Sequence, residues 1–282
     1  MSTSRSGARA GLVQITLAGL LWGTTGVVVQ IIRKHTGLSA ISIGFYRLAI
    51  AALFLLALQF RTLPALVRAV RASPARLILV GVGLGAYQAS YFISVAAVGV
   101  SLSTMVSLGV APVCIAVWES VVARRTPSRL TVGSLTTGIA GLALITSAGG
   151  HTTTGAQRPL LGLVAAVVSG VGYAASTVLS RHVSQRTPAM TLTTVSCVFG
   201  ALALLPFALI SGLGFPAEPG AVSDLVYIGV VATAIAYALF YGGLRVTAGS
   251  VAAVLTLLEP LTAAVLAVLV LGEPLSVLEA LG

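Results

Sequence analysis

The sequence predicts an all-α polytopic membrane protein, a ten-span bundle built from two inverted five-helix repeats. Three observations predict it. Of the 282 residues, 57% are hydrophobic and only 8% are charged, whereas soluble domains carry roughly 25% charged residues. Apolar runs of about 20 residues, enough to cross a ~30 Å hydrocarbon layer as a helix, recur along the chain. Finally, several segments of the first half recur in the same order in the second half.

The apolar runs predict nine complete spans and the start of a tenth. Their ranges are 11–32, 39–60, 77–98, 102–123, 132–148, 160–180, 189–211, 224–244 and 250–271. The tenth begins near Leu275 and stops at Gly282, so we expect its helix to be truncated in this chain. The first run is too long for the core of a signal peptide and is interpreted as an uncleaved span.

The basic residues predict the orientation in the membrane. A net charge of +10 would suggest a nucleic-acid partner for a soluble protein, but Lys and Arg in short membrane loops mark the cytoplasmic side. With the N-terminus inside, the outer loops hold only Arg33, Lys34 and Arg158. The cytoplasmic segments collect Arg5, Arg9, Arg61, Arg68, Arg71, Arg76, Arg124, Arg125, Arg129, Arg181, Arg186 and Arg245. We therefore predict a cytoplasmic N-terminus and no nucleic-acid partner.

An internal match divides the chain into residues 1–150 and 151–282. The segment YQASYFISVAAVGVS is echoed by YALFYGGLRVTAGS at an offset of 150, and LLWGTT has a weaker counterpart in GVGYAAS. An odd number of spans in each half inverts the second half relative to the first. The charges agree, because RRTPSRL is basic and its counterpart GEPLSVL is acidic.

Two prolines also match between the halves, Pro112 and Pro260, at an offset of 148. Each falls inside a predicted span, where proline removes a helix hydrogen bond and kinks the helix. We predict paired hinges or gates at these positions; static kinks that only shape packing are the alternative. Between the second and third spans, RTLPALVRAVRASPAR mixes arginine with apolar residues, which is typical of a short interfacial helix or a loop.

A layer of aromatic residues at mid-depth is the main candidate site. Trp and Tyr usually collect at membrane interfaces, yet six of them fall near the middles of their spans: Trp22, Tyr46, Tyr87, Tyr91, Tyr173 and Tyr237. Tyr87 and Tyr91 share a helix face, as do Tyr237 and Tyr241, and Gln88 adjoins the first pair. Buried hydroxyls need hydrogen-bond partners. These residues predict a wet central cavity, with aromatic packing between helices as the alternative.

Arg47 is the one intramembrane cation. It lies about eight residues into its span, roughly 12 Å deep at 1.5 Å per residue. A charge there costs about 2.5 kcal/mol or more unless it faces protein or water. Glu259 lies at comparable depth, whereas Glu119 lies near the inner end of its span. We expect Arg47 to contact Glu259 or backbone carbonyls; capture of a substrate carboxylate and snorkelling to the interface are the alternatives.

Catalytic and energy-coupling motifs are missing from the sequence. It holds no GxxxxGK[ST] loop for ATP, no HExxH and no two acidic residues on one span, as the corresponding enzymes would need. The only cysteines, Cys114 and Cys197, both lie inside apolar spans and form no CxxC set. We predict that the protein is not an enzyme and has no cofactor and no metal site.

Three motifs, LLWGTTG, FYRLAIAALFLL and LEPLTAAVLAVLVLGEPLS, resemble the EamA-type members of the drug/metabolite transporter (DMT) superfamily. The resemblance covers the whole chain and is greatest to bacterial amino-acid exporters of the YddG type. It implies a basket-shaped bundle in the bacterial inner membrane, a central substrate cavity, alternating access and export without ATP. The residues that match the family motifs are Trp22, Gly23, Arg47, Glu259, Pro260 and Glu273. The chain departs from the family where Arg125 replaces a frequent hairpin glutamate.

We therefore predict a secondary transporter or facilitator that exports amino acids or similar amphipathic metabolites, with the lipid bilayer and a small-molecule substrate as its partners. The substrate-binding candidates are Trp22, Tyr46, Arg47, Tyr87, Gln88, Tyr91, Tyr173, Tyr237, Tyr241 and Glu259. A multidrug, nucleobase or nucleotide-sugar carrier is the alternative within transport; a membrane scaffold or an intramembrane enzyme is the alternative outside it. Whether protons drive transport stays open.

Overall fold

The computed structural model describes residues 2–126, 128–148, 158–216 and 218–271, and within these ranges the chain forms helices and no strand. The helices are α1 (Ser2–Thr36), α2 (Ala40–Leu58), the 3₁₀ turn η1 (Phe60–Thr62), α3 (Leu63–Ala72), α4 (Pro74–Val98), α5 (Val100–Ala123), α6 (Arg129–Ala148), α7 (Pro159–Ser184), α8 (Ala189–Ile210), α9 (Pro219–Gly229), the π-helical turn η2 (Val230–Ile235), α10 (Ala236–Leu244), α11 (Gly249–Leu255) and α12 (Leu258–Leu271).

Eight segments of the described chain are long and apolar enough to cross a membrane, and Thr131–Leu144 in α6 is a shorter apolar helix. Each of the nine complete spans predicted from sequence therefore corresponds to a helical segment. The predicted tenth span and Glu273 lie outside the described residues. The chain is a polytopic membrane protein; ten spans and the inverted repeat stay predictions.

Two of the predicted spans are interrupted rather than continuous. The span Pro219–Leu244 contains the π-helical turn η2, in which the Thr233 hydroxyl donates a 2.7 Å hydrogen bond to the carbonyl of Ile228, five residues earlier. The following span breaks between α11 and α12, and Pro260 lies in the first turn of α12. Proline is tolerated there because its missing N–H would have no partner in the helix. Pro112, by contrast, lies inside the unbroken α5.

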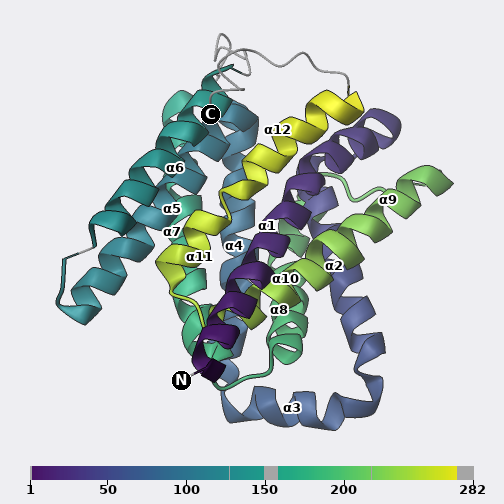
Figure 1. Cartoon of the computed structure of the whole chain (residues 1–282). Coiled ribbons are helices and arrows are strands. Elements are labelled where there is room, and N and C mark those ends of the chain that lie inside the picture. The colour runs from purple at the N-terminus through teal and green to yellow at the C-terminus, as the bar shows by residue number, and fades with distance from the viewer. Residues whose placement is uncertain (1, 127, 149–157, 217, 272–282) are drawn as a thin grey trace.

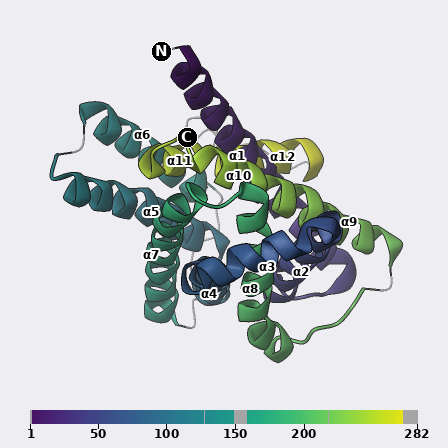
Figure 2. The same cartoon turned by 90° about the horizontal axis from the view of Figure 1, so that it is seen from below.

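The helices pack into one bundle with α3 lying across one end (Figure 1). In the bundle α4 packs against α7 and α8, α1 against α10 and α12, α2 against α8 and α9, and α5 against α7. Seen from below, α3 runs across the end of the bundle and contacts α4 and α8 (Figure 2). Its Leu66 is buried while Leu63, Val67, Arg68 and Arg71 are exposed, so the predicted interfacial segment is a helix that packs on the protein through Leu66.

Small residues let the helices approach closely. A Cβ built on Gly85 of α4 would lie 2.7 Å from the carbonyl oxygen of Gly200 on α8. A Cβ on Gly23 of α1 would lie 2.7 Å from the carbonyl oxygen of Glu259 on α12. The second contact holds α1 and α12 together at the depth of Glu259.

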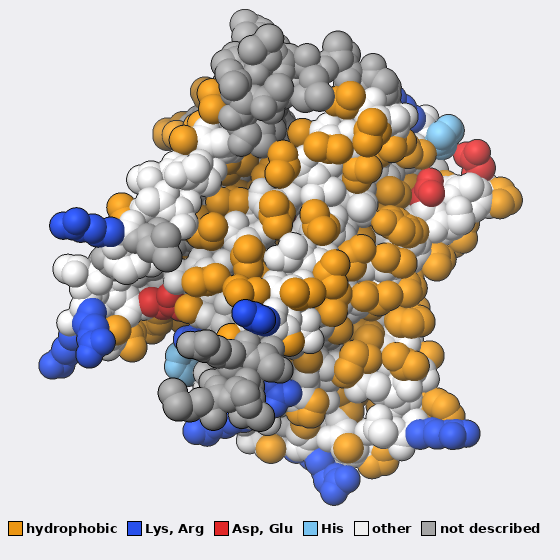
Figure 3. Space-filling view, viewed as in Figure 1, with side chains coloured by type: hydrophobic (Ala, Val, Ile, Leu, Met, Phe, Trp, Pro, Cys, Tyr) orange, Lys and Arg blue, Asp and Glu red, His pale blue; other side chains and the backbone are white. Residues whose placement is uncertain are grey.

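Charge and apolar surface are separated on the molecule. Figure 3 shows hydrophobic side chains along the flank of the bundle and most basic side chains toward the end that α3 covers. We call this the arginine-rich end; it includes Arg61 in η1, Arg68 and Arg71 in α3, and Arg76 in the first turn of α4. The exposed apolar flank is the surface that a bilayer would cover.

Candidate functional site

A cavity of about 280 Å³ lies between the helices. Its walls come from α1, α2, α4, α5, α7, α10 and the start of α12. Eight of the ten predicted substrate-binding residues line it: Trp22, Arg47, Tyr87, Gln88, Tyr91, Tyr173, Tyr237 and Glu259. Small-molecule sites typically measure ~300–1,000 Å³. The volume therefore suits a small solute.

The cavity occupies the half of the bundle opposite the arginine-rich end. On α2, which runs toward α3, its lining residues lie between Ala40 and Arg47; on α4, which runs away from α3, they lie between Tyr87 and Val95. Gln30 and Arg33 near the end of α1 also line the cavity and are exposed to solvent. The cavity thus reaches from the middle of the bundle to the end away from α3.

Aromatic rings close the deep end of the cavity. The hydroxyls of Tyr87 and Tyr237 share a hydrogen bond of 2.9 Å. Trp22 packs on Tyr237 with 4.9 Å between ring centroids, and Tyr173 meets Tyr87 edge to face at 5.3 Å. These four side chains come from α1, α4, α7 and α10, so four of the six aromatic residues that the sequence places at one depth form one cluster.

Three hydroxyl residues that were not predicted from the sequence, Thr104, Ser107 and Ser169, also belong to the site. Tyr91 shares a 2.7 Å hydrogen bond with Thr104, and Ser169 donates to the carbonyl of Tyr87 at 3.0 Å. Ser107 in turn donates to Ser169 at 3.0 Å. Thr104, Ser107 and Ser169 all line the cavity. A central cavity and helix-to-helix hydroxyl bonds, treated as alternatives above, therefore coexist.

One signal could have found part of this set. Ser169 lies four residues before Tyr173, so both project from one face of α7. No comparable pattern marks Thr104 and Ser107, because small hydroxyl residues are common throughout these spans.

Arg47 and Glu259 line the same cavity but do not form the contact expected from their matching depth. The one ion pair within the described part of the chain joins Arg181 and Glu119. The Nε–H group of Arg47 is buried and has no hydrogen-bond partner, so it does not bind a backbone carbonyl either. The two charges are close enough to interact electrostatically. They project from α2 and α12, and equal depth did not bring their side chains into contact.

Tyr46 and Tyr241 do not line the cavity. Tyr46 donates a 3.1 Å hydrogen bond to the carbonyl of Gly214, in the loop after α8, and meets Phe215 edge to face. Tyr241 is fully buried, and its hydroxyl donates to Ser196 on α8 at 3.2 Å. In this conformation Tyr46 packs on the loop after α8, and Tyr241 packs between α10 and α8. Neither side chain forms part of the cavity wall.

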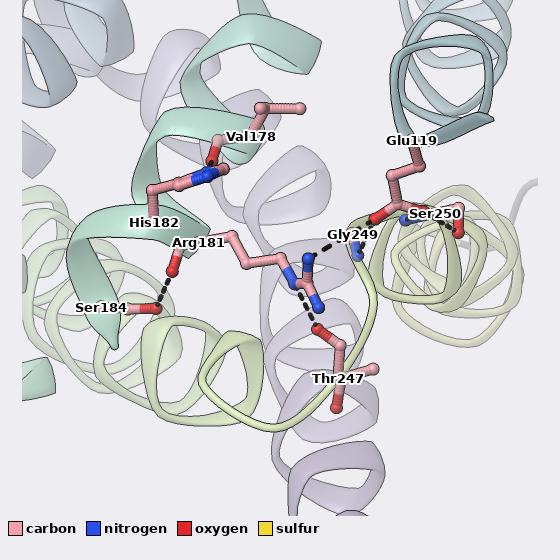
Figure 4. A network of polar contacts seen from close by, with 8 residues as sticks. All are labelled: Glu119, Val178, Arg181, His182, Ser184, Thr247, Gly249 and Ser250. Atoms are coloured by element: carbon pink, nitrogen blue, oxygen red, sulfur yellow. Dashed lines mark hydrogen bonds and ion pairs between the residues drawn. The ribbon is translucent and has the colours of Figure 1, made fainter. Parts of the chain in front are cut away.

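A second polar network ties three helices together on the arginine-rich side of the cavity (Figure 4). The Glu119 carboxylate, on α5, accepts the backbone N–H of Gly249 at 2.7 Å and the hydroxyl of Ser250. These groups begin α11, so Glu119 caps that helix from a neighbouring one. Arg181 of α7 donates its Nε–H to the carbonyl of Thr247 at 3.0 Å and lies 4.0 Å from Glu119.

A polytopic helical bundle around a solute-sized cavity is the architecture of a membrane transporter. The chain belongs to the EamA-like transporter family, whose model matches residues 9–147 and, a second time, residues 160–282.

Similar proteins agree with this assignment. The Bacillus subtilis transporter YwfM, itself uncharacterised, is 27% identical over 248 residues, which cover 88% of this chain and 81% of YwfM. The Salmonella typhimurium inner membrane transporter YicL, also uncharacterised, is 25% identical over 260 residues, 90% of this chain and 85% of YicL. One solved crystal structure has a TM-score of 0.80 at 18% identity and covers 96% of this chain and 92% of the other; this likeness shows the fold alone.

Proposed function

We propose that this protein is a secondary transporter or facilitator that exports amino acids, or metabolites of similar size and polarity, across a bacterial inner membrane. One observation carries the proposal. Arg47 and Glu259, a cation and an anion at mid-depth, line one small cavity without an ion pair between them. An amino acid is a zwitterion and can supply the opposite charge to each.

The energetics of buried charge favour a ligand with both signs. Taking a charge out of water costs several kcal/mol unless a partner replaces its hydration. A solute with an ammonium and a carboxylate group would neutralise Glu259 and Arg47 together. Aromatic and apolar walls, including Phe92, Val95 and Leu108, would then hold the rest of the solute.

Alternating access is the proposed mechanism. The cavity extends toward the end opposite α3, while the Tyr87–Tyr237 contact lies at its deep end and the Glu119 network lies on the arginine-rich side. In the positive-inside orientation, this conformation would face outward. Export would then alternate with a state in which these contacts open. The repeated match of the family model to the two halves of the chain supports rocking of one repeat against the other.

A nucleotide-sugar carrier of the same fold is the second candidate. Phosphorylated solutes favour several cations in the cavity, and the sequence predicts only one there, Arg47. The structure adds Arg33, which lines the cavity near its mouth. Arg33 is exposed to solvent, so it would attract anionic solutes to the entrance of the cavity. It would not bind a phosphate group at the deep end.

Transport by the purified protein in liposomes tests the proposal. Each amino acid would be offered in labelled form to proteoliposomes with and without the protein, alongside nucleobases and a nucleotide sugar. We expect protein-dependent flux of at least one class of amino acid. Flux of another solute class, with none for any amino acid, would contradict the proposal. Imposing a pH gradient or a membrane potential in the same vesicles identifies the driving force.

A further inference from the structure

Buried polar atoms without hydrogen-bond partners are concentrated on the walls of the cavity. Within the described part of the chain, five side-chain atoms have this property: Trp22 Nε1, Thr25 Oγ1, Arg47 Nε, Gln88 Nε2 and Thr247 Oγ1. Four of the five belong to residues that line the cavity, and Thr247 is the exception. Native proteins leave few buried polar groups unpaired, so this concentration calls for an explanation.

Three of these four atoms can only donate hydrogen bonds: the indole N–H of Trp22, the Nε–H of Arg47 and the amide NH₂ of Gln88. Trp22 and Gln88 are each only 5% exposed, so bulk water reaches neither side chain freely. A buried donor without an acceptor destabilises the protein by about 1–3 kcal/mol. No acceptor on the wall lies within hydrogen-bond distance of these three atoms.

The three donors line the same cavity as the tyrosine pair. Trp22 packs on the Tyr237 ring, Gln88 follows Tyr87 on α4, and the charge of Arg47 lies close enough to both tyrosines to interact with them. The tyrosine hydroxyls are bonded to each other and leave the three donors unsatisfied. We call Trp22, Arg47 and Gln88 the donor cluster.

We propose that the donor cluster binds the carboxylate of the transported solute, and that a free carboxylate is the group this transporter requires. A carboxylate offers two oxygens with about four lone-pair sites, which matches donors that arrive from three helices. A small adjustment of these side chains on binding would bring the buried N–H groups to the ligand. The ammonium group would then lie toward Glu259. This inference rests on the proposed function and adds to it the orientation of the solute and the group that is recognised.

The first test varies the solute. Proteoliposomes holding the wild-type protein would be assayed for inhibition of the uptake of a transported amino acid by three competitors: the unlabelled amino acid, its carboxamide and the corresponding amine. Loss of hydrogen bonds to a charged acceptor should weaken competition by the carboxamide and the amine about tenfold or more. Equal competition by all three would overturn the proposal.

The second test varies the donors. Trp22→Phe keeps an aromatic ring and removes the N–H; Gln88→Leu keeps a side chain of similar bulk and removes the amide. Each variant should raise the half-saturation concentration for the amino acid about tenfold and leave the weak inhibition by the carboxamide unchanged. A purely structural role would change both together. Gln14→Leu, on α1 but outside the cavity, should behave as the wild type.

Failure of the inference can be told apart from failure of the proposed function. Transport of amino acids and their carboxamides at similar rates would leave the function standing and overturn the carboxylate requirement. Transport of a different carboxylate solute, with no amino-acid flux, would overturn the function and support the donor cluster. Transport restricted to solutes without a carboxylate would overturn both. If Trp22→Phe does not fold, Gln88→Leu and the competitor series carry the test.

Discussion

The hydroxyl groups of Tyr87 and Tyr237 lie 2.9 Å apart and share a hydrogen bond. The two residues are 150 positions apart in segments that match each other in sequence, so matching positions of the two predicted repeats meet at the deep end of the cavity. The bond connects α4 to α10. A conformational change that moves α4 away from α10 at this depth would separate the two rings.

Removing either hydroxyl breaks the same bond. We expect Tyr87→Phe and Tyr237→Phe each to lower the free energy of unfolding by about 1 kcal/mol. The double variant should lose no more than one single variant, because the second substitution also removes the hydroxyl left unpaired by the first. Unfolding in detergent measures the change. Losses that simply add would show that the hydroxyls act independently.

The second prediction concerns Arg47 and Glu259. Because no ion pair joins them, Arg47→Ala and Glu259→Gln should both fold, and each should reduce amino-acid transport about tenfold or more through loss of a charged contact with the solute. Arg47→Lys should retain part of the activity. Combining Arg47→Ala with Glu259→Gln should not rescue transport or yield. Loss of folding in both single variants, with recovery in the pair, would instead reveal a structural tie.

Capping of α11 by Glu119 gives the third prediction. Glu119→Ala removes the acceptor for the Gly249 N–H and the Ser250 hydroxyl and should lower the free energy of unfolding by about 1–2 kcal/mol. Glu218→Ala is the matched control, because Glu218 precedes α9 without a side-chain cap bond. Thermal unfolding in one detergent compares the two. Equal effects would contradict the capping role.

A fourth prediction tests the approach of α4 and α8. Gly85→Ala would place a methyl group 2.7 Å from the carbonyl oxygen of Gly200 and should destabilise the protein by about 1–3 kcal/mol through overpacking. Gly109→Ala, on α5, meets no atom within 4 Å and should be neutral or slightly stabilising, because alanine favours helix. Similar stabilities of the two variants would contradict the close packing.

Orientation is the fifth prediction. In a variant without Cys114 and Cys197, a single cysteine at His35, exposed near the end of α1, should react in intact cells with a thiol reagent that cannot cross the membrane. A cysteine at Ala65, exposed on α3, should react only after the cells are opened. The expectation follows from the excess of arginine at the α3 end. The reverse labelling pattern would place the N-terminus outside.

Much of the fold could be predicted because membrane helices are encoded locally. The length and apolarity of each run locate a span, and all nine complete predicted spans coincide with helical segments. The interruptions were harder to predict. The π-helical turn contains a bond from the Thr233 hydroxyl to a carbonyl five residues back, and no hydropathy window detects such a turn. Pro260 did mark the region of the second break, although it follows the break by several residues.

The sequence by itself determined the depth of each residue along its helix, since depth depends only on where an apolar run begins and ends. It thereby placed Trp22, Tyr87 and Tyr237 in one layer. Only the tertiary structure decided which side of each helix faces the cavity. Rotation about a helix axis depends on contacts with segments distant in sequence, such as Tyr46 with Gly214 and Tyr241 with Ser196. For the same reason Arg47 and Glu259 share a depth and a cavity without forming an ion pair.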